Sequence, residues 1–155
     1  MNVEDYIPHR GPARMIDRLV EVDAEHVVAE ADVPARGRLV RDGAMPAWAA
    51  IELMAQAVAA WAGERACRDG RAPPLGFLVS VRRCDMTRAD VPAGTTLRIE
   101  AHCDFIGANG LGTFGCAVYE EAELVARAEL SVFEPPDAAL YLAGVAPGAD
   151  AEATP

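Results

Sequence analysis

Glu52 is the residue whose surroundings in the sequence point most directly to chemistry. It interrupts the longest apolar stretch of the chain, residues 45–63, in which Gln56 is the only other hydrophilic side chain. A carboxylate among apolar neighbours costs free energy unless it is paired or protonated. Glu52 therefore either reaches solvent or a structural arginine, or it acts as a general acid or base. Gln56 follows one helical turn later, where it can hold the carboxylate or a nearby backbone group.

His9 is the second candidate for proton transfer. It stands in a stiff segment between Pro8 and Pro12, and histidine is the side chain that exchanges protons near neutral pH. The alternative is a structural histidine that pins the N-terminal segment in place. His26 and His102 lack a nearby acid that would mark a catalytic triad, so we expect both to be structural.

A long helix must position Glu52 and Gln56. Pro46 suits the first helical turn, and Arg65, Arg68 and Gly70 suit the last one, which predicts a helix over residues 46–70. Because its residues are apolar on nearly every side, we expect it to be buried almost all round. Free backbone N–H groups at its start, next to Gly43, could hold a carbonyl oxygen or a negative group.

The other predicted elements are strands, two before the helix and four after it. A polar loop over residues 34–43 separates the first pair from the helix, and an α+β fold with one sheet wrapped around one central helix is the simplest packing of this order. We expect a single domain over residues 1–134, and an Ala- and Pro-rich tail over residues 135–155 whose last dozen residues are disordered. The strands are predicted at residues 13–22, 26–32, 75–86, 95–106, 112–120 and 124–133. The strand at 75–86 is apolar enough for its open edge to pair with another chain, which predicts a dimer.

The composition excludes several classes of function. The 155 residues include 14 arginines, 24 acidic residues and no lysine, for a net charge of −10. A nucleic-acid partner is not expected, because phosphate backbones require a positive face. Schiff-base chemistry and lysine-containing phosphate loops are excluded as well. No CxxC pair occurs among the four cysteines, so we expect no metal site. Without a signal peptide or a membrane span, the chain is predicted to be cytoplasmic, with reduced thiols.

Two segments, PHRGPARMIDRLVEVD and MPAWAAIELMAQAVAAWAG, resemble the 3-hydroxyacyl-[acyl carrier protein] dehydratases, and in particular the ApeP-like branch linked to aryl polyene biosynthesis. The resemblance covers roughly residues 6–134 and includes the signature that here is Glu52-Leu53-Met54-Ala55-Gln56. It implies a hotdog fold, in which a curved antiparallel sheet wraps around one long helix. It also implies dehydration of a 3-hydroxyacyl thioester carried on phosphopantetheine, without a metal or organic cofactor. The implied partners are an acyl carrier protein and a second hotdog chain, in a homodimer or in a heterodimer with a related dehydratase.

The sequence departs from this family at one important position. Arg38 stands where ordinary members carry a catalytic histidine, and no histidine lies between His26 and His102. The resemblance then leaves His9 as the base and Glu52 as the acid, with the start of the helix near Gly43 polarising the thioester carbonyl. Substrate contacts are predicted at Gly43, Pro46, Trp48 and Gln56.

Two other functions remain open. One is a non-catalytic subunit that stabilises an active dehydratase, and the other is a hotdog thioesterase that directs water at an acyl thioester. Either way, an acidic carrier protein would need a local basic patch on a chain of this net charge. The candidates are Arg71, Arg82, Arg83 and Arg88, unless these form an ordinary solvated face.

Overall fold

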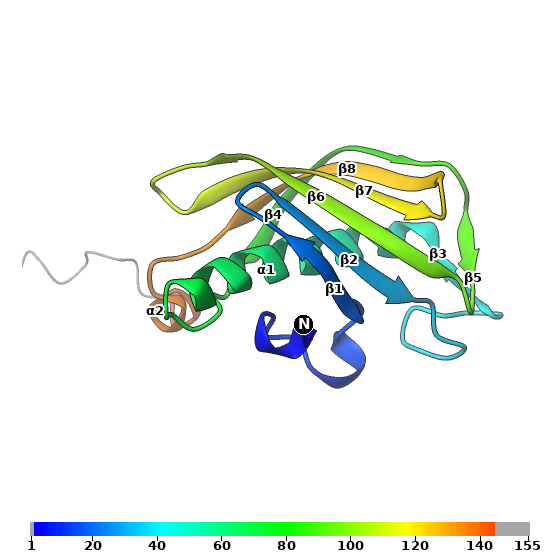
Figure 1. The fold of residues 1–155 in the computed structure, drawn as a ribbon, viewed down its shortest axis with the longest axis horizontal. Helices are drawn as coiled ribbons and strands as arrows, with labels where there is room; N and C mark the ends of the chain where they lie inside the picture. Colours follow the sequence, from blue (N-terminus) through cyan, green and yellow to red (C-terminus); the bar gives the residue numbers. More distant parts are fainter. Residues whose placement is uncertain (1, 145–155) are drawn as a thin grey trace, which may run out of the picture.

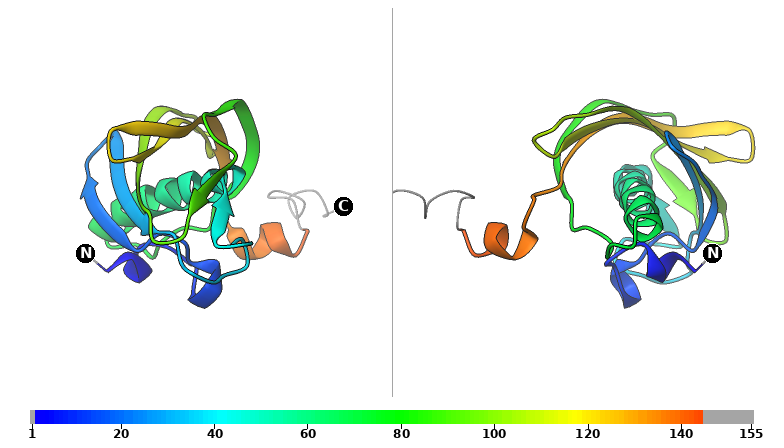
Figure 2. Two further views of the ribbon diagram at one scale, coloured as in Figure 1. Left: turned by 90° about the vertical axis from the view of Figure 1, so that its right-hand side faces the viewer. Right: turned by 60° about the vertical axis from the view of Figure 1, so that its left-hand side comes forward.

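A computed structural model describes residues 2–144, in which a six-stranded antiparallel sheet curves around the long helix α1 (Ala50–Arg68) (Figure 1). The strand order is β1-β2-β6-β7-β8-β4. Figure 2 shows α1 nearly end-on, enclosed by the curved sheet. The predicted α+β hotdog architecture is therefore confirmed. The sheet consists of β1 (Arg18–Val22), β2 (His26–Asp32), β4 (Phe77–Met86), β6 (Thr96–Ile106), β7 (Leu111–Glu120) and β8 (Glu123–Phe133).

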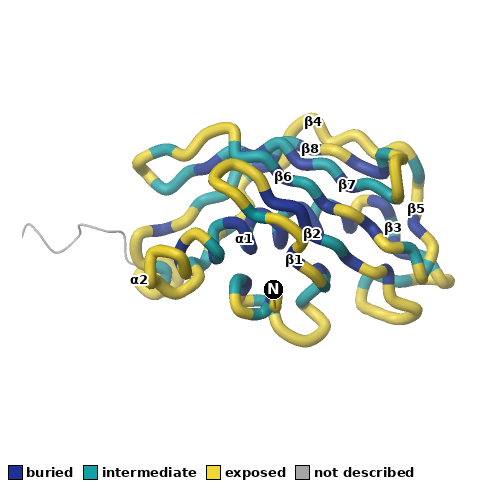
Figure 3. The backbone as a smooth tube through the Cα atoms, viewed as in Figure 1, coloured by how far each residue is buried: buried dark blue, intermediate teal, exposed yellow. Residues whose placement is uncertain are grey.

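Helix α1 forms the centre of the core, as its apolar sequence predicts. Every residue from position 50 to 64 is buried or half-buried, and the exposed residues of the helix, Arg65, Cys67 and Arg68, lie in its last turn. Leu53 and Met54 are completely buried, and the helix packs mainly against β2, β6 and β7 (Figure 3). Burying a side chain of this size contributes about 1.5–3 kcal/mol. The helix is thus a rigid support for any side chain that it carries at the edge of the core.

The start of α1 differs from the prediction. Pro46 belongs to a short strand, β3 (Ala44–Pro46), that pairs with β5 (Asp90–Pro92), and a 3-10 turn, η3 (Ala47–Ala49), links β3 to the helix. The predicted first strand is shorter too, because a 3-10 turn, η2 (Gly11–Ala13), occupies its start and β1 begins only at Arg18. The local proline and glycine pattern does not reveal pairing with residues that are distant in the sequence. Such pairing, and the 3-10 turns, determine where these elements begin.

The N-terminal segment is docked on the side of α1. Val3 of η1 (Val3–Asp5) and Ile7 are buried in the core. Gly63 on α1 permits this approach, because a Cβ atom there would lie 1.8 Å from the carbonyl oxygen of Tyr6. The Arg10 guanidinium donates hydrogen bonds to the carbonyl oxygens of Glu4 and His9, over 2.8 and 2.9 Å. These hydrogen bonds fix His9 and Arg10 relative to the preceding turn η1.

Strand β4 forms one edge of the sheet and pairs only with β8. Every residue of β4 is exposed or half-buried, including the large apolar side chains of Leu78 and Val79. Arg83 adopts a positive φ of 48° within the irregular pairing between Arg82 and Asp85. Within residues 2–144, the strand predicted to have an open edge does have one.

Beyond the sheet, the short helix α2 (Ala138–Leu142) lies in the predicted tail and packs Tyr141 against Phe77 and Phe133. The disorder predicted for the last dozen residues concerns positions that, apart from Gly144, lie outside the described residues. None of the helices in the described part of the chain is long and apolar enough to cross a bilayer.

Candidate active site

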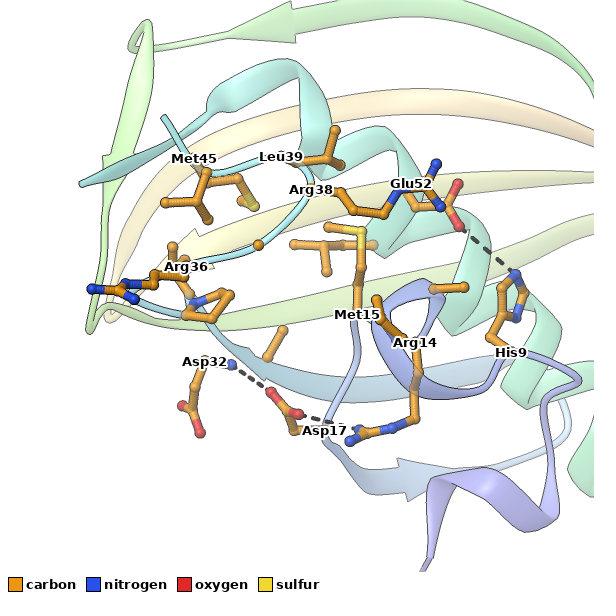
Figure 4. Close-up of a pocket in the computed structure, with 18 of the residues that line it drawn as sticks. His9, Arg14, Met15, Asp17, Asp32, Arg36, Arg38, Leu39, Met45 and Glu52 are labelled. Atoms are coloured by element: carbon orange, nitrogen blue, oxygen red, sulfur yellow. Dashed lines mark hydrogen bonds and ion pairs between the residues drawn. The ribbon is translucent and has the colours of Figure 1, made fainter. Parts of the chain in front are cut away.

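A cavity of about 730 Å³ lies between the N-terminal segment, the first turn of α1 and the loop that follows β2 (Figure 4). This volume is in the range of small-molecule sites. Much of the wall is apolar, and the polar groups that face it include the predicted pair His9 and Glu52. The apolar wall is formed by Met15, Val33, Leu39, Val40, Met45 and Leu53.

His9 and Glu52 meet at one side of this cavity. His9 Nε2 lies 3.7 Å from Glu52 Oε1, and the exposed fractions of the two side chains are 30% and 44%. The carboxylate is thus half exposed at the cavity wall instead of buried in the helix. The other ring nitrogen of His9, Nδ1, is buried and has no hydrogen-bond partner among the described residues. Of the two ring nitrogens of His9, Nε2 is therefore the one that approaches Glu52.

Gln56 lies beneath this pair and is completely buried. Its Nε2 donates hydrogen bonds to Glu52 Oε1 and to the Ala13 carbonyl oxygen, both over 2.8 Å. Its Oε1 accepts hydrogen bonds from the backbone N–H groups of Met15 and Ile16, over 2.8 and 3.3 Å. Gln56 does not line the cavity, and both of its polar atoms are engaged within the protein. The side chain that was predicted to contact substrate thus links the N-terminal segment to the carboxylate.

The other predicted substrate contacts are divided between two places. Trp48 lines the cavity and is 55% exposed. Gly43 and Pro46 do not line it, because β3 turns them toward the small sheet with β5. The backbone N–H of Ala47, the first residue of η3, is also used, since it donates to the Ala89 carbonyl oxygen over 2.9 Å. The predicted oxyanion position at Gly43 is therefore outside the cavity.

The loop after β2 contributes to the cavity, which its sequence does not predict. We expected residues 34–43 to form a polar connection, but Arg36, Arg38, Leu39 and Val40 all line the cavity. The adjacent apolar pair Leu39 and Val40, inside an otherwise polar loop, is the signal that could have indicated a buried face. Arg38 is an exposed side chain of this loop that extends toward Glu52 in the view of Figure 4.

An acidic pair lies on another part of the cavity wall. Asp17 accepts hydrogen bonds from Arg14 Nη1 over 3.2 Å and from the backbone N–H of Asp32 over 2.8 Å (Figure 4). Hydrogen bonds from Arg18 and Thr96 lower the pKa of Asp32 from 3.8 to about 2. Asp32 is therefore ionised at neutral pH, and hydrogen bonds from neighbouring residues hold both carboxylates in place at the wall.

The predicted basic patch is largely neutralised. Arg88 pairs with Glu120 and Glu123, Arg83 pairs with Glu129, and Arg71 pairs with Asp69. Arg82 has no ion-pair partner among residues 2–144. Three of the four candidate arginines therefore carry carboxylate partners, which removes most of the positive field expected there.

The remaining titratable side chains lie away from the cavity. His26 and His102 face each other across β2 and β6, with ring centroids 4.4 Å apart. All four cysteines are free, and Cys116 is buried, which raises the pKa of its thiol to about 12. Within the described residues, no three His, Cys, Asp or Glu side chains are grouped as metal ligands.

Proteins of known structure share this fold, and a family model matches most of the chain. A family model described as ApeP-like, ApeP dehydratase, matches residues 1–143. The chain is similar to a chain of the dehydratase heterocomplex ApeI:P from Xenorhabdus doucetiae, with a TM-score of 0.83 and 25% identity over 92% of this chain and 97% of that one.

More distant hotdog proteins share the fold alone. A hypothetical thioesterase protein with coenzyme A from Streptococcus pneumoniae has a TM-score of 0.59 at 14% identity, and covers 76% of this chain and 84% of its own. A Streptococcus mutans protein bound to acetyl CoA has a TM-score of 0.60 at 16% identity, with coverages of 78% and 89%.

Proposed function

The chain belongs to the ApeP-like dehydratase family, and from this premise we propose that it removes water from a 3-hydroxyacyl thioester to give the 2,3-unsaturated thioester. The acyl group would be carried on the phosphopantetheine arm of an acyl carrier protein. The observation that supports this proposal most is the approach of His9 Nε2 to Glu52 Oε1 at the wall of one cavity. The two groups are a proton acceptor and a proton donor of the kind that an elimination requires.

The proposed reaction uses one proton at each group. His9 Nε2 takes the proton from C2 of the acyl chain, and the electron pair of that C–H bond moves toward the thioester carbonyl. The pair then forms the C2–C3 double bond while the C3–O bond breaks. Glu52 gives its proton to the departing hydroxyl, which leaves as water. Because the two side chains are 3.7 Å apart, the proton on His9 can return to Glu52 and restore the starting state.

Gln56 supports the same assignment. Its hydrogen bond to Glu52 Oε1 and its three hydrogen bonds to residues 13–16 hold the carboxylate and the N-terminal segment in a fixed relation. General acid–base catalysis needs both groups within reach of one substrate. In this proposal, Gln56 acts through Glu52 and does not itself touch the substrate.

The test is turnover of a 3-hydroxyacyl thioester by the wild-type chain, His9→Ala and Glu52→Ala, with His26→Ala as the matched control. His26 is exposed and lies outside the cavity, so its loss should leave turnover unchanged. Loss of His9 or Glu52 should lower the rate at least about a hundredfold, the usual scale for a general acid or base. Equal rates for all variants would exclude this pair. Release of free thiol without dehydration would instead indicate a thioesterase.

We further propose that the chain works as one half of a heterodimer with a related hotdog dehydratase, joined through the free edge of β4. The similar Xenorhabdus chain is described as part of a dehydratase heterocomplex, and β4 offers an unpaired strand with exposed Leu78 and Val79. If the wild-type chain is inert alone but raises the activity of its partner, this chain is a non-catalytic subunit. The cytoplasmic location stays a prediction of the sequence.

A further inference from the structure

The proposed elimination places negative charge where His9 and Glu52 cannot neutralise it. When the C2 proton leaves, the electron pair of the C–H bond is shared with the thioester carbonyl oxygen, which becomes an enolate oxygen. A fixed donor or a positive charge at that oxygen is usually the largest single contribution to such a reaction. His9 is occupied with the C2 proton and Glu52 with the C3 hydroxyl. A third group is therefore required, and this inference rests on the proposed function.

The backbone groups predicted for this task are not in position to perform it. Gly43 does not line the cavity, and Pro46 has no N–H group. The N–H of Ala47 already donates to the Ala89 carbonyl oxygen. None of these three positions therefore offers a free backbone N–H group to the cavity.

Among the arginines of the cavity wall, Arg14 is already engaged. Its guanidinium donates to the Ile16 carbonyl oxygen over 2.6 Å and pairs with Asp17 and Glu4. Arg36 and Arg38 line the same cavity and form no ion pair or side-chain hydrogen bond with any described residue. Most other arginines of this acidic chain have a carboxylate partner. Two positive charges of the wall are therefore left free to meet an anionic group.

The positions of these two arginines differ. In Figure 4, Arg38 extends toward Glu52, whereas Arg36 lies at the opposite side of the cavity from His9. An arginine stays protonated throughout the physiological range, so it cannot remove a proton, but its N–H groups can donate to an oxyanion. We propose that Arg38 donates hydrogen bonds to the thioester carbonyl oxygen and stabilises the enolate formed when His9 removes the C2 proton.

Two variants of the full-length protein separate this role from general charge effects. Arg38→Gln removes the charge that extends toward Glu52 in Figure 4, and Arg41→Gln removes an equal charge from the same loop at a residue that does not line the cavity. Both side chains are exposed, so neither change should disturb folding, which circular dichroism can verify. We expect Arg38→Gln to lower kcat about 10²–10³-fold with little change in KM, the effect of losing an oxyanion donor. Arg38→Lys should recover part of the loss, and Arg41→Gln should stay near the wild-type kcat.

A second measurement detects the enolate without turnover. The N-acetylcysteamine thioester of 3-oxobutyrate forms an enolate with its own ultraviolet absorption, and the wild-type protein should increase that absorption on binding. Arg38→Gln should abolish the increase, and Arg41→Gln should keep it. If the wild-type protein gives the increase but no dehydration, the role of Arg38 stands and the proposed function fails.

Several outcomes would overturn the inference. Dehydration by Arg38→Gln at the wild-type kcat would do so while leaving the proposed function intact. A rise in KM alone would also overturn it, because it would assign Arg38 to substrate binding. Equal losses in Arg41→Gln and Arg38→Gln would do the same, because they would indicate a general charge effect. Absence of both dehydration and enolate formation in the wild-type protein would reject the inference and the proposed function together.

Discussion

Gln56 donates a hydrogen bond to Glu52 one helical turn earlier, over 2.8 Å between Nε2 and Oε1, from a side chain with no exposed surface. The same amide binds three backbone groups of residues 13–16. The orientation of the carboxylate and the path of the N-terminal segment therefore depend on one side chain. Since His9 belongs to that segment, Gln56 helps to fix the position of His9 relative to Glu52.

Replacing Gln56 should affect stability and turnover together. Gln56→Ala leaves the backbone groups of Ala13, Met15 and Ile16 without their partner, and each buried unsatisfied group costs about 1–3 kcal/mol. We expect urea unfolding to give a loss of at least that size, with a fall in turnover in the fraction that stays folded. A variant of unchanged stability and turnover would contradict the positioning role of Gln56.

Gly63→Ala tests the docking of the N-terminal segment. The new Cβ atom would lie 1.8 Å from the Tyr6 carbonyl oxygen, which belongs to the backbone and has to move. Overpacking of this kind costs about 1–3 kcal/mol, and displacing Tyr6 should carry His9 away from Glu52. Unfolding and turnover measured on the same preparation should both fall.

Gly37→Ala is the matched control for the stability measurement. A Cβ atom at Gly37 would meet the nearest side-chain atom at an ordinary 3.5 Å. Its free energy of unfolding should stay near the wild-type value. If Gly63→Ala and Gly37→Ala unfold alike, the close contact with Tyr6 is not a constraint on the fold.

The stability of the fold should decrease in acid because of Asp32. Its pKa is lowered to about 2 by hydrogen bonds from Arg18 and Thr96, below the value of 3.8 expected for the unfolded chain. The unfolded state therefore binds more protons between these values, so stability is present above pH 3.8 and is lost as the pH falls toward 2. Asp32→Asn should flatten this part of the curve of unfolding free energy against pH. An unchanged slope in the variant would show that other carboxylates control it.

Alkylation of the cysteines can locate the interface with a partner. Cys84 on β4 and Cys67 at the end of α1 are both exposed in the described chain, and Cys116 is buried with a pKa of about 12. We expect iodoacetamide at mild alkaline pH to modify Cys67 and Cys84 in the isolated chain and to spare Cys116. Assembly through β4 should protect Cys84 alone, as measured by mass spectrometry of the digested protein. Equal labelling of Cys84 before and after assembly would place the interface elsewhere.

The sequence was sufficient for the parts of the fold that repeat a local pattern. The apolar run around Glu52 gave the central helix, and the alternating segments gave all six strands of the large sheet to within a few residues, except at the start of β1. The prediction for the start of the helix was wrong because Pro46 pairs with Asp90, 44 positions later. Pairing between such distant residues leaves no local pattern.

The candidate site could be predicted only in part from the sequence, for the same reason. His9 and Glu52 could be identified as candidates by residue type alone. The ion pair between Arg88 and Glu120, which helps to neutralise the predicted basic patch, depends on contacts between segments that are distant in the sequence. The contribution of Arg38 to the cavity depends on how the loop after β2 folds back over α1. Periodicity does not describe such a loop.

The free edge of β4 has a consequence for how the protein is handled. A sheet that ends in an unpaired, apolar strand is stabilised when a second chain adds to it. The unfolding midpoint of the protein should therefore rise with protein concentration and with the supply of a partner. Production in excess of that partner would leave the strand available for non-native pairing. Co-production of two chains in matched amounts should therefore improve the yield of the folded protein more than any change in buffer.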